Sequence, residues 1–234
     1  MSAQRSLYFW LGALTAVSIA GLLLLGLSGQ EALRELDSAV TSTRDVGAAV
    51  RRQMDADMMH DAIRSDVYAA LHAANENDAG QSADVAKDLA EHVERFNTNI
   101  AENAAADLSA EARAQTERIK PGIARYTGSA REVIELAASD IAAAKAKLPG
   151  FNQDFAALED EMEKLSDLIQ VRAEAAEGDA RTTMQRAQWL MGGILLVTLL
   201  LAVLAQRYVQ GIIADPIREL AAVAADITRT GDLS

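Results

Sequence analysis

The segment that decides the fold is Trp189–Gln206, with the sequence WLMGGILLVTLLLAVLAQ. It contains no charged residue, and Arg207 follows it directly. A helix needs about 20 apolar residues to cross the ~30 Å hydrocarbon core of a bilayer. Because Ala187 and Gln188 extend the run toward that length, we expect a membrane crossing here rather than a buried core helix.

A second uncharged run, Leu7–Leu27, lies near the N-terminus and follows Arg5. Tyr8 and Trp10 stand at its start, where aromatic residues favour the membrane interface. A cleaved signal peptide is the alternative, because small residues follow the run. The run is longer than the ~7–15 residues of a signal core, and a helical pattern continues past it, so we expect an anchor.

The composition indicates an all-α protein. Half of the 234 residues are hydrophobic, yet there are only four Phe, four Tyr, two Trp and three Pro. The absence of cysteine excludes a disulfide scaffold, thiolate metal sites and cysteine nucleophiles. Residues 29–186 hold 30 Asp and Glu against 18 Lys and Arg, which accounts for the net charge of −12. Such an acidic segment repels nucleic acid, so no nucleic-acid partner is expected.

The charges that flank the two apolar runs predict the topology. Arg5, Arg207 and Arg218 lie outside the runs, while the segment between them is acidic, so both termini are expected in the cytoplasm. The predicted order is a cytoplasmic N-terminus at 1–6, a membrane helix at 7–28, an external domain at 29–186, a second membrane helix at 187–207 and a cytoplasmic helix at 208–234.

Turn signals divide the external domain into four predicted helices. They end or begin at the cluster 75–80, at Asp107–Ser109 with Ser109 as an N-cap, and at the turn Leu148–Phe151. The predicted helices run from the membrane to Ala74, from Ser82 to Ala106, from Ala110 to Lys147 and from Asn152 into the second membrane run. Pro121 is expected to kink or break the third helix.

Apolar residues at steps of three and four predict a shared core. One stripe belongs to the first helix and one to the fourth, and together they favour an up-down four-helix bundle. The stripes are Met59, Ile63, Val67, Ala70 and Ala74, then Phe155, Leu158, Met162, Leu165 and Ile169. Residues Met54 and Met58, beside Met59, are expected to serve as adaptable core filler.

After the second membrane run, apolar residues again follow steps of four and three. They are Ile213, Ile217, Leu220, Ala224 and Ile227, a pattern typical of a coiled-coil seam. The sequence ends soon after, at the turn signal Gly231–Ser234. We therefore expect this sequence to be a fragment of a longer protein.

Two sets of motifs resemble the bacterial methyl-accepting chemotaxis proteins, or chemoreceptors. Asp215–Leu220 (DPIREL), followed by GDL at 231–233, resembles the first helix of a HAMP signal-relay domain. Met58–Val67 (MMHDAIRSDV) and Leu148–Phe151 (LPGF) are similar to parts of the four-helix-bundle sensor domains of some chemoreceptors. The resemblance assigns signal relay to Pro216, Leu220, Gly231, Asp232 and Leu233.

The resemblance implies a homodimeric receptor in the bacterial inner membrane with its bundle in the periplasm. A downstream kinase and adaptor would be reached only through a C-terminal region that this sequence lacks. Because HAMP segments also occur in sensor histidine kinases and cyclases, either output stays open. A membrane-anchored bundle that binds a partner protein is a further alternative.

A polar stripe on the first helix holds the candidate ligand residues. His60, Arg64, Tyr68 and His72 follow one another at steps of four. In related receptors, arginines on this helix bind the carboxylates of small ligands, and a planar guanidinium suits that task. The expected ligand-binding residues are Arg64, Tyr68, His72, Asn152 and Gln153, and the expected ligand is an organic acid or amino acid. The alternative is an ordinary solvated face.

No sequence pattern indicates catalysis or a cofactor. The chain has no glycine-rich phosphate loop, no nucleophile motif and no recognisable frame of paired carboxylates, so no enzymatic activity is expected. The acidic patch Glu159–Glu163 is interpreted as solvated. His60 and His72 stand twelve residues apart and cannot share a metal ion without further ligands, so no metal site is expected.

Overall fold

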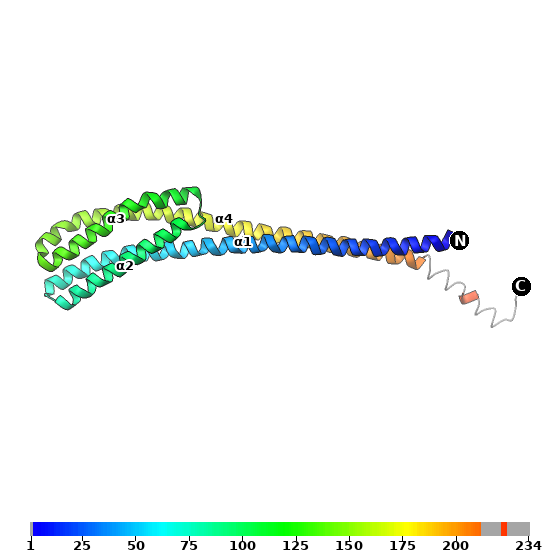
Figure 1. The fold of residues 1–234 in the computed structure, drawn as a ribbon, viewed down its shortest axis with the longest axis horizontal. Helices are drawn as coiled ribbons and strands as arrows, with labels where there is room; N and C mark the ends of the chain where they lie inside the picture. Colours follow the sequence, from blue (N-terminus) through cyan, green and yellow to red (C-terminus); the bar gives the residue numbers. More distant parts are fainter. Residues whose placement is uncertain (1, 212–220, 224–234) are drawn as a thin grey trace. The chain divides into compact units, whose positions relative to one another are not determined.

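The computed structural model describes residues 2–211 and 221–223, with side chains from residue 12 onward except those of 13, 14 and 209. The described residues are helical and contain no strand. Figure 1 shows the four helices, α1 (Ser2–Glu76), α2 (Ala79–Ala105), α3 (Ala110–Ser139) and α4 (Ile141–Val209). The all-α prediction is therefore confirmed for this part of the chain.

The chain divides into two units. One, which we call the core unit, comprises Ser38–Ala180. The other, the apolar unit, comprises Met1–Asp37 together with Arg181–Ser234. Helices α1 and α4 each contribute residues to both units, whereas α2 and α3 belong to the core unit alone.

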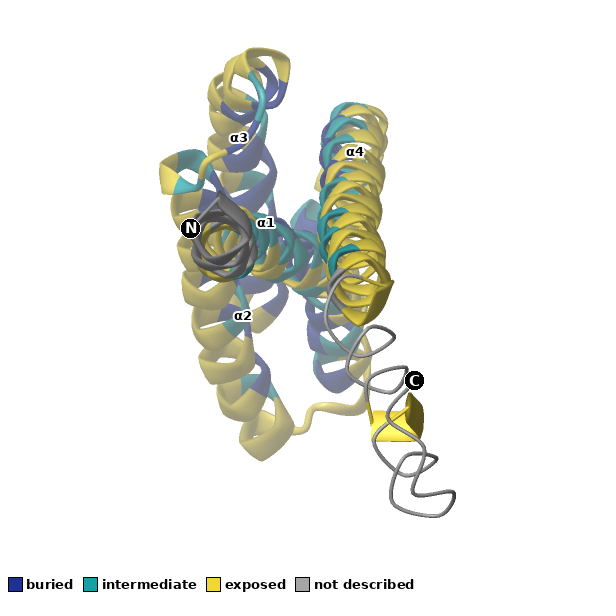
Figure 2. Cartoon of the chain, turned by 90° about the vertical axis from the view of Figure 1, so that its right-hand side faces the viewer, coloured by how far each residue is buried: buried dark blue, intermediate teal, exposed yellow. Residues whose placement is uncertain are grey.

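All four helices contribute to one hydrophobic core in the core unit. Figure 2 shows the buried residues on the inward faces of the helices and the exposed ones outside. The two predicted stripes lie in this core, with Ile63 and Val67 of α1 and Leu165 and Ile169 of α4 almost completely buried. Because each buried Leu, Ile or Val contributes about 1.5–3 kcal/mol, this shared core outweighs local helix propensity in holding the unit together.

Polar caps form the first two connections. Asn77 adopts a left-handed conformation (φ 55°), which Asn tolerates better than most residues, and its N–H reaches the Ala74 carbonyl at 3.3 Å. Asp78 then caps α2 by accepting the Gln81 N–H at 3.0 Å. Ser109 caps α3 by accepting the Ala112 N–H at 3.1 Å, as predicted.

The third connection lies elsewhere than predicted. The turn placed at Leu148–Phe151 is wrong, because α3 ends at Ser139 and α4 begins at Ile141 and continues through Pro149. Asp140 alone separates them, with an extended backbone and with Oδ1 accepting the N–H groups of Ala142 and Ala143 at 3.1 and 3.0 Å. Pro149 removes one helical hydrogen bond, but burial of Phe151 next to it favours the helix.

Pro121 also lies within a continuous helix, because α3 runs through it to Ser139. A break at this position, one of the two predicted outcomes, is therefore wrong. The flanking residues Ile119 and Ile123 are both buried in the core. Their packing against the other helices stabilises the helical path on both sides of the proline.

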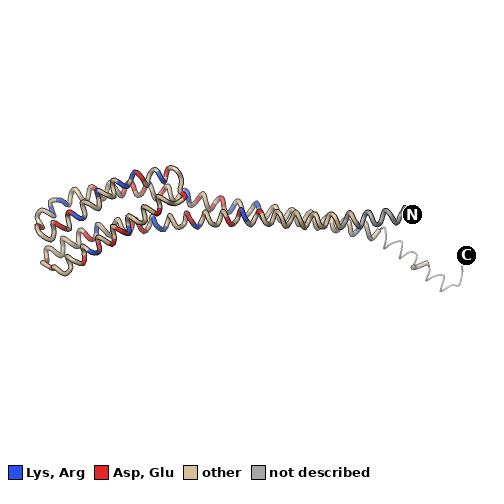
Figure 3. The backbone as a smooth tube through the Cα atoms, in the orientation of Figure 1, with Lys and Arg blue, Asp and Glu red and all other residues tan. Residues whose placement is uncertain are grey.

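The apolar unit contains the two uncharged runs. Helices α1 and α4 each include a stretch long and apolar enough to cross a membrane, and these stretches are not buried within the structure. Figure 3 shows them as segments without charged side chains, while acidic and basic residues crowd the core unit. Exposed apolar surface of this extent is typical of a site that contacts lipid or another protein.

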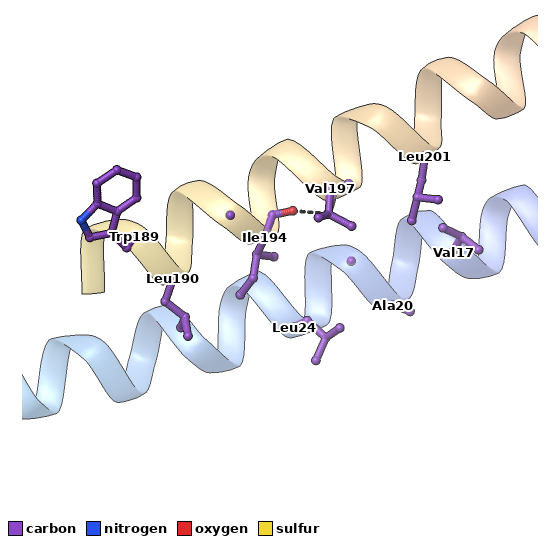
Figure 4. Close-up of a pocket in the computed structure, with 11 residues that line it drawn as sticks. Val17, Ala20, Leu24, Trp189, Leu190, Ile194, Val197 and Leu201 are labelled. Atoms are coloured by element: carbon purple, nitrogen blue, oxygen red, sulfur yellow. Dashed lines mark hydrogen bonds between the residues drawn. The ribbon is translucent and has the colours of Figure 1, made fainter. Parts of the chain in front are cut away.

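The two apolar stretches pack closely at Gly21. A Cβ atom at this position would lie 2.9 Å from Cγ2 of Thr198, so a larger residue would force Thr198 or the helix to shift. An apolar groove beside the contact is lined by side chains of both helices, including Leu24, Trp189 and Ile194 (Figure 4). Small residues at such a contact are typical of helices that pack in a membrane.

The predicted C-terminal helix falls largely outside the described residues. Pro216, Leu220, Gly231, Asp232 and Leu233, expected to relay the signal, lie there, as do the coiled-coil positions from Ile213 to Ile227. Their prediction rests on the sequence alone.

Candidate functional site

Helices α1 and α4 bring together three of the five predicted ligand residues. The Tyr68 hydroxyl donates a hydrogen bond to Oδ1 of Asn152 at 3.1 Å. One turn earlier on α1, the Arg64 guanidinium lies over the ring of Phe155, with Cζ 4.4 Å from the ring centroid. Arg64, Tyr68 and Asn152 are exposed, so their polar groups are accessible to a solute. We call these three residues with Phe155 the α1–α4 site.

The other two predicted ligand residues lie near this site without joining it. His72 and Gln153 are exposed. Neither makes a side-chain hydrogen bond within the described part of the chain, and the geometry gives them no defined role.

The connections at one end of the core unit lie near each other. Lys145 donates to the side-chain oxygen of Asn75 at 3.0 Å, which links the start of α4 to the end of α1. Asn77 and Asp78 share a shallow depression with Ser139. The sequence predicts the α3–α4 connection at Leu148–Phe151 and not at Asp140. The proximity of this connection to the α1–α2 connection nevertheless agrees with the predicted order of helices.

His60 occupies the core and not the polar stripe that the sequence suggested. Its side chain is 2% exposed and stacks on Phe155, with ring centroids 4.2 Å apart and an angle of 6° between the planes. The rings of Tyr126 (4.8 Å) and Phe96 (6.3 Å) complete an aromatic cluster drawn from all four helices. The spacing of buried residues on α1 could have placed His60 in the core. They follow steps of four and three through Ala49, Gln53, Ala56, His60, Ile63, Val67 and Ala70.

This aromatic surrounding keeps His60 neutral. Burial lowers its pKa to about 4, with the charge of Arg64 acting in the same direction and that of Asp61 opposing it. Nε2 has no hydrogen-bond partner among the described residues. Burial also raises the pKa of Tyr126, whose hydroxyl donates to the His60 carbonyl at 2.7 Å. The cluster is therefore uncharged at neutral pH.

Polar pairs join α1 to α2 on another side of the unit. Asp55 accepts hydrogen bonds from Arg95 (2.7 Å) and Asn99 (2.6 Å), and the bond from Arg95 is the main cause of a lowered Asp55 pKa. Asp66 accepts from, or donates to, Nδ1 of His92 at 2.7 Å. The Asp66 pKa is nevertheless raised, because burial outweighs the interaction with His92. These groups hold α1 and α2 together.

An apolar face of α1 remains uncovered. Met54 and Met58 are 64% and 63% exposed, so the prediction that they fill the core is wrong for both, while Met59 is buried as expected. In the core unit, the exposed large hydrophobic residues described are Val40, Met54, Met58 and Tyr68 on α1 and Val171 on α4. We call the four residues on α1 the α1 face.

Two further charged groups make defined contacts. Arg52 bonds to Oδ1 of Asn103 at 2.8 Å, which makes it an interhelical contact. In the acidic patch, Glu161 accepts from Gln115 at 2.8 Å and pairs with Lys164. Among the described residues, no three His, Asp or Glu side chains are grouped so that they could hold a metal ion.

No family model, curated protein or solved structure matches this chain.

Proposed function

We propose that this chain is the input part of a bacterial chemoreceptor that binds a small anionic solute at the α1–α4 site. The observation that carries the proposal is that the α1–α4 site and the two stretches suited to a membrane belong to the same two helices. Arg64 and Tyr68 belong to α1, Asn152 and Phe155 belong to α4, and these two helices also contain the stretches suited to a membrane. A change at the site is therefore a change in the contact between the two helices that enter the bilayer.

The chemistry of the site suits a carboxylate. The Arg64 guanidinium offers a planar pair of N–H donors, and the hydroxyl of Tyr68 and the amide of Asn152 supply further donors within the same exposed region. A bound carboxylate would compete with Phe155 for Arg64 and with Asn152 for Tyr68. It would thus replace two direct α1–α4 contacts by contacts through the ligand.

In this proposal the core unit is a periplasmic up-down four-helix bundle, and both termini are cytoplasmic. The exchange of α1–α4 contacts would favour one of two packings of the bundle, and a small displacement of α4 would carry the change into the membrane. The segment with Pro216 and Leu220 would receive it as the first helix of a HAMP domain. This assignment rests on the motifs and charges of the sequence.

The α1 face supports a homodimer as the functional form. Within the core unit, four exposed large apolar residues lie on α1, against one on α4 and none described on α2 or α3, which favours a partner on this side. Two copies of the chain in one membrane have the same orientation, so their α1 helices would pack side by side and parallel. The same face would serve the alternative function, a membrane-anchored bundle that binds a different protein.

A ligand screen with the whole chain in lipid nanodiscs tests the proposal. Organic acids and amino acids would be compared by the midpoint of thermal unfolding, because a ligand at 100 times its Kd stabilises the folded state by about 2.7 kcal/mol. We expect a carboxylate to raise the midpoint in the wild type and not in Arg64→Ala. Arg113→Ala, which removes another exposed arginine, should preserve the response.

Two outcomes of the screen would contradict the proposal. A ligand whose effect survives Arg64→Ala and Tyr68→Phe would bind elsewhere than the α1–α4 site. A protein that responds to none of the solutes, yet forms a stable complex with a different protein through the α1 face, would favour the alternative function.

A further inference from the structure

The Phe155 ring contacts both an exposed cation and a buried imidazole. Arg64 lies 4.4 Å from the ring centroid and His60 lies 4.2 Å from it in a nearly parallel plane. Both groups therefore contact the same ring, which places the surface charge at Arg64 close to the buried imidazole of His60.

Water is excluded from the His60 side of this contact, although Arg64 itself is exposed. The phenyl ring is nonpolar and excludes water, and His60 is almost completely buried. A proton on His60 would place a second positive charge near Arg64, and their repulsion, reduced by the exposure of Arg64, disfavours the protonated form. The positive charge of Arg64 therefore disfavours protonation of His60.

The other groups that face His60 complete its electrostatic surroundings. From α1 these are Asp61, which favours the protonated form, and Arg64, which opposes it. From α3, Tyr126 contributes a neutral hydroxyl that is engaged by the His60 carbonyl. From α2, Phe96 contributes an uncharged ring, and from α4, Phe155 contributes its ring and a backbone group that favours the protonated form. Arg64 is thus the one cation in this set, and like Asp61 it is exposed to solutes.

We propose that Arg64, Phe155 and His60 form a proton-linked relay, in which loss or neutralisation of the charge at Arg64 favours protonation of His60 inside the core. The relay itself rests on the proximity of Arg64 and His60 at the Phe155 ring and on the repulsion between their charges. Its use by a ligand rests on the proposed function, because an anion is then the agent that neutralises Arg64.

The relay has a reciprocal consequence. If an anion at Arg64 makes His60 easier to protonate, then protonation of His60 must strengthen anion binding by the same factor. The site would therefore bind its anion more tightly as the pH falls toward the pKa of His60. A protonated His60 also carries two N–H donors into a core that offers Nε2 no partner, so proton uptake would disturb the packing of all four helices.

A pH titration of His60 by NMR tests the relay directly. The chain has only three histidines, so selective imidazole labelling of the whole chain in nanodiscs gives three signals. In Arg64→Gln we expect the pKa of His60 to rise, because the charge of Arg64 lowers it in the wild type. Arg64→Lys keeps the charge and should keep the wild-type value, and Arg113→Gln is the matched control.

The result that would overturn the relay is a His60 pKa in Arg64→Gln equal to that of the wild type. Where a variant unfolds in acid before the titration ends, its urea unfolding between pH 4.5 and 6.5 replaces the NMR readout. The free energy of unfolding should then fall less steeply with decreasing pH in Arg64→Gln than in Arg64→Lys. The reason is that a higher pKa of His60 in the folded protein lies closer to its pKa in the unfolded chain. Equal slopes would also overturn the relay.

Succinate separates the relay from the proposed function. If succinate raises the His60 pKa in the wild type and not in Arg64→Gln, both are supported. If Arg64→Gln raises the pKa while neither succinate nor any other carboxylate of the screen does so, the relay is upheld and the carboxylate receptor is rejected.

Discussion

The hydroxyl of Tyr126 donates a 2.7 Å hydrogen bond to the backbone carbonyl of His60, which joins α3 to α1 in the middle of the aromatic cluster. The tyrosine is completely buried, so this bond has no competition from water. Phe151 stacks on the same ring, with centroids 5.3 Å apart. The pairing makes the cluster a fixed point of the core unit rather than a set of loosely packed rings.

Replacement of Tyr126 by Phe should lower the free energy of unfolding by about 1 kcal/mol, because it removes the hydrogen bond and keeps the ring. Urea unfolding monitored by circular dichroism measures the change. Tyr68→Phe is the matched control, since its hydroxyl bond to Asn152 is exposed and should contribute less than about 0.5 kcal/mol. Equal losses in both variants would contradict a special role for the buried bond.

The stability of the core unit should fall as the pH decreases from 6.5 to 4. His60 has a folded pKa of about 4 against 6.5 for a free histidine, so the unfolded chain binds more protons in this window. The His60 contribution is fully present above pH 6.5 and is lost progressively below it, by up to about 3 kcal/mol. Urea unfolding at a series of pH values measures this slope.

His60→Phe isolates that contribution, because it keeps an aromatic ring and removes the titrating group. The raised pKa of Asp66 acts in the opposite direction near its own titration, but it is present in both proteins and cancels in the comparison. The difference in the free energy of unfolding between wild type and His60→Phe should therefore depend on pH between 4 and 6.5 and be constant above pH 6.5. A constant difference over the whole range would show that His60 is accessible to protons in the folded state.

Asp140→Ala should destabilise the core unit by about 1 kcal/mol, because it removes the cap that starts α4. Pro149→Ala should instead increase stability, since proline inside a helix is about 3 kcal/mol less favourable than alanine. Hydrogen exchange at the amides of Lys147 and Phe151 checks the assignment independently. Unprotected amides at both positions would place the turn at Pro149 after all.

Met58→Lys should weaken self-association of the chain in detergent, because a charge replaces an apolar side chain on the α1 face. Val171→Lys makes the same change at a residue of α4 that is equally exposed (64%) and should leave association unaffected. Light scattering coupled to size-exclusion chromatography measures the oligomeric state. A wild-type protein that is monomeric at every concentration would contradict the proposed homodimer.

The sequence predicts those features that depend on neighbouring residues or on regular spacing. The uncharged runs, the core stripes of α1 and α4, the cap at Ser109 and the end of α1 before Asn77 all follow from local patterns, and the structure contains them. Part of the site follows in the same way, because steps of four place Arg64 and Tyr68 on one face.

The errors arise where packing between helices overrides a local preference. Pro149 and Gly150 are strong turn signals, but burial of Phe151 and Phe155 keeps the helix intact, and Asp140 forms the connection instead. His60 looks polar beside Arg64, yet three aromatic rings from other helices surround it. Met58 looks like core filler, yet its helix turns that face outward. Each of these outcomes depends on residues distant in the sequence.

The unequal connections of the core unit restrict how its helices can move. Two residues, Asn77 and Asp78, separate α1 from α2, and Asp140 alone separates α3 from α4. Four residues, 106–109, separate α2 from α3. A short connection limits how far one helix can move along its neighbour. We therefore expect α1 with α2, and α3 with α4, to move as two hairpins if the helices shift.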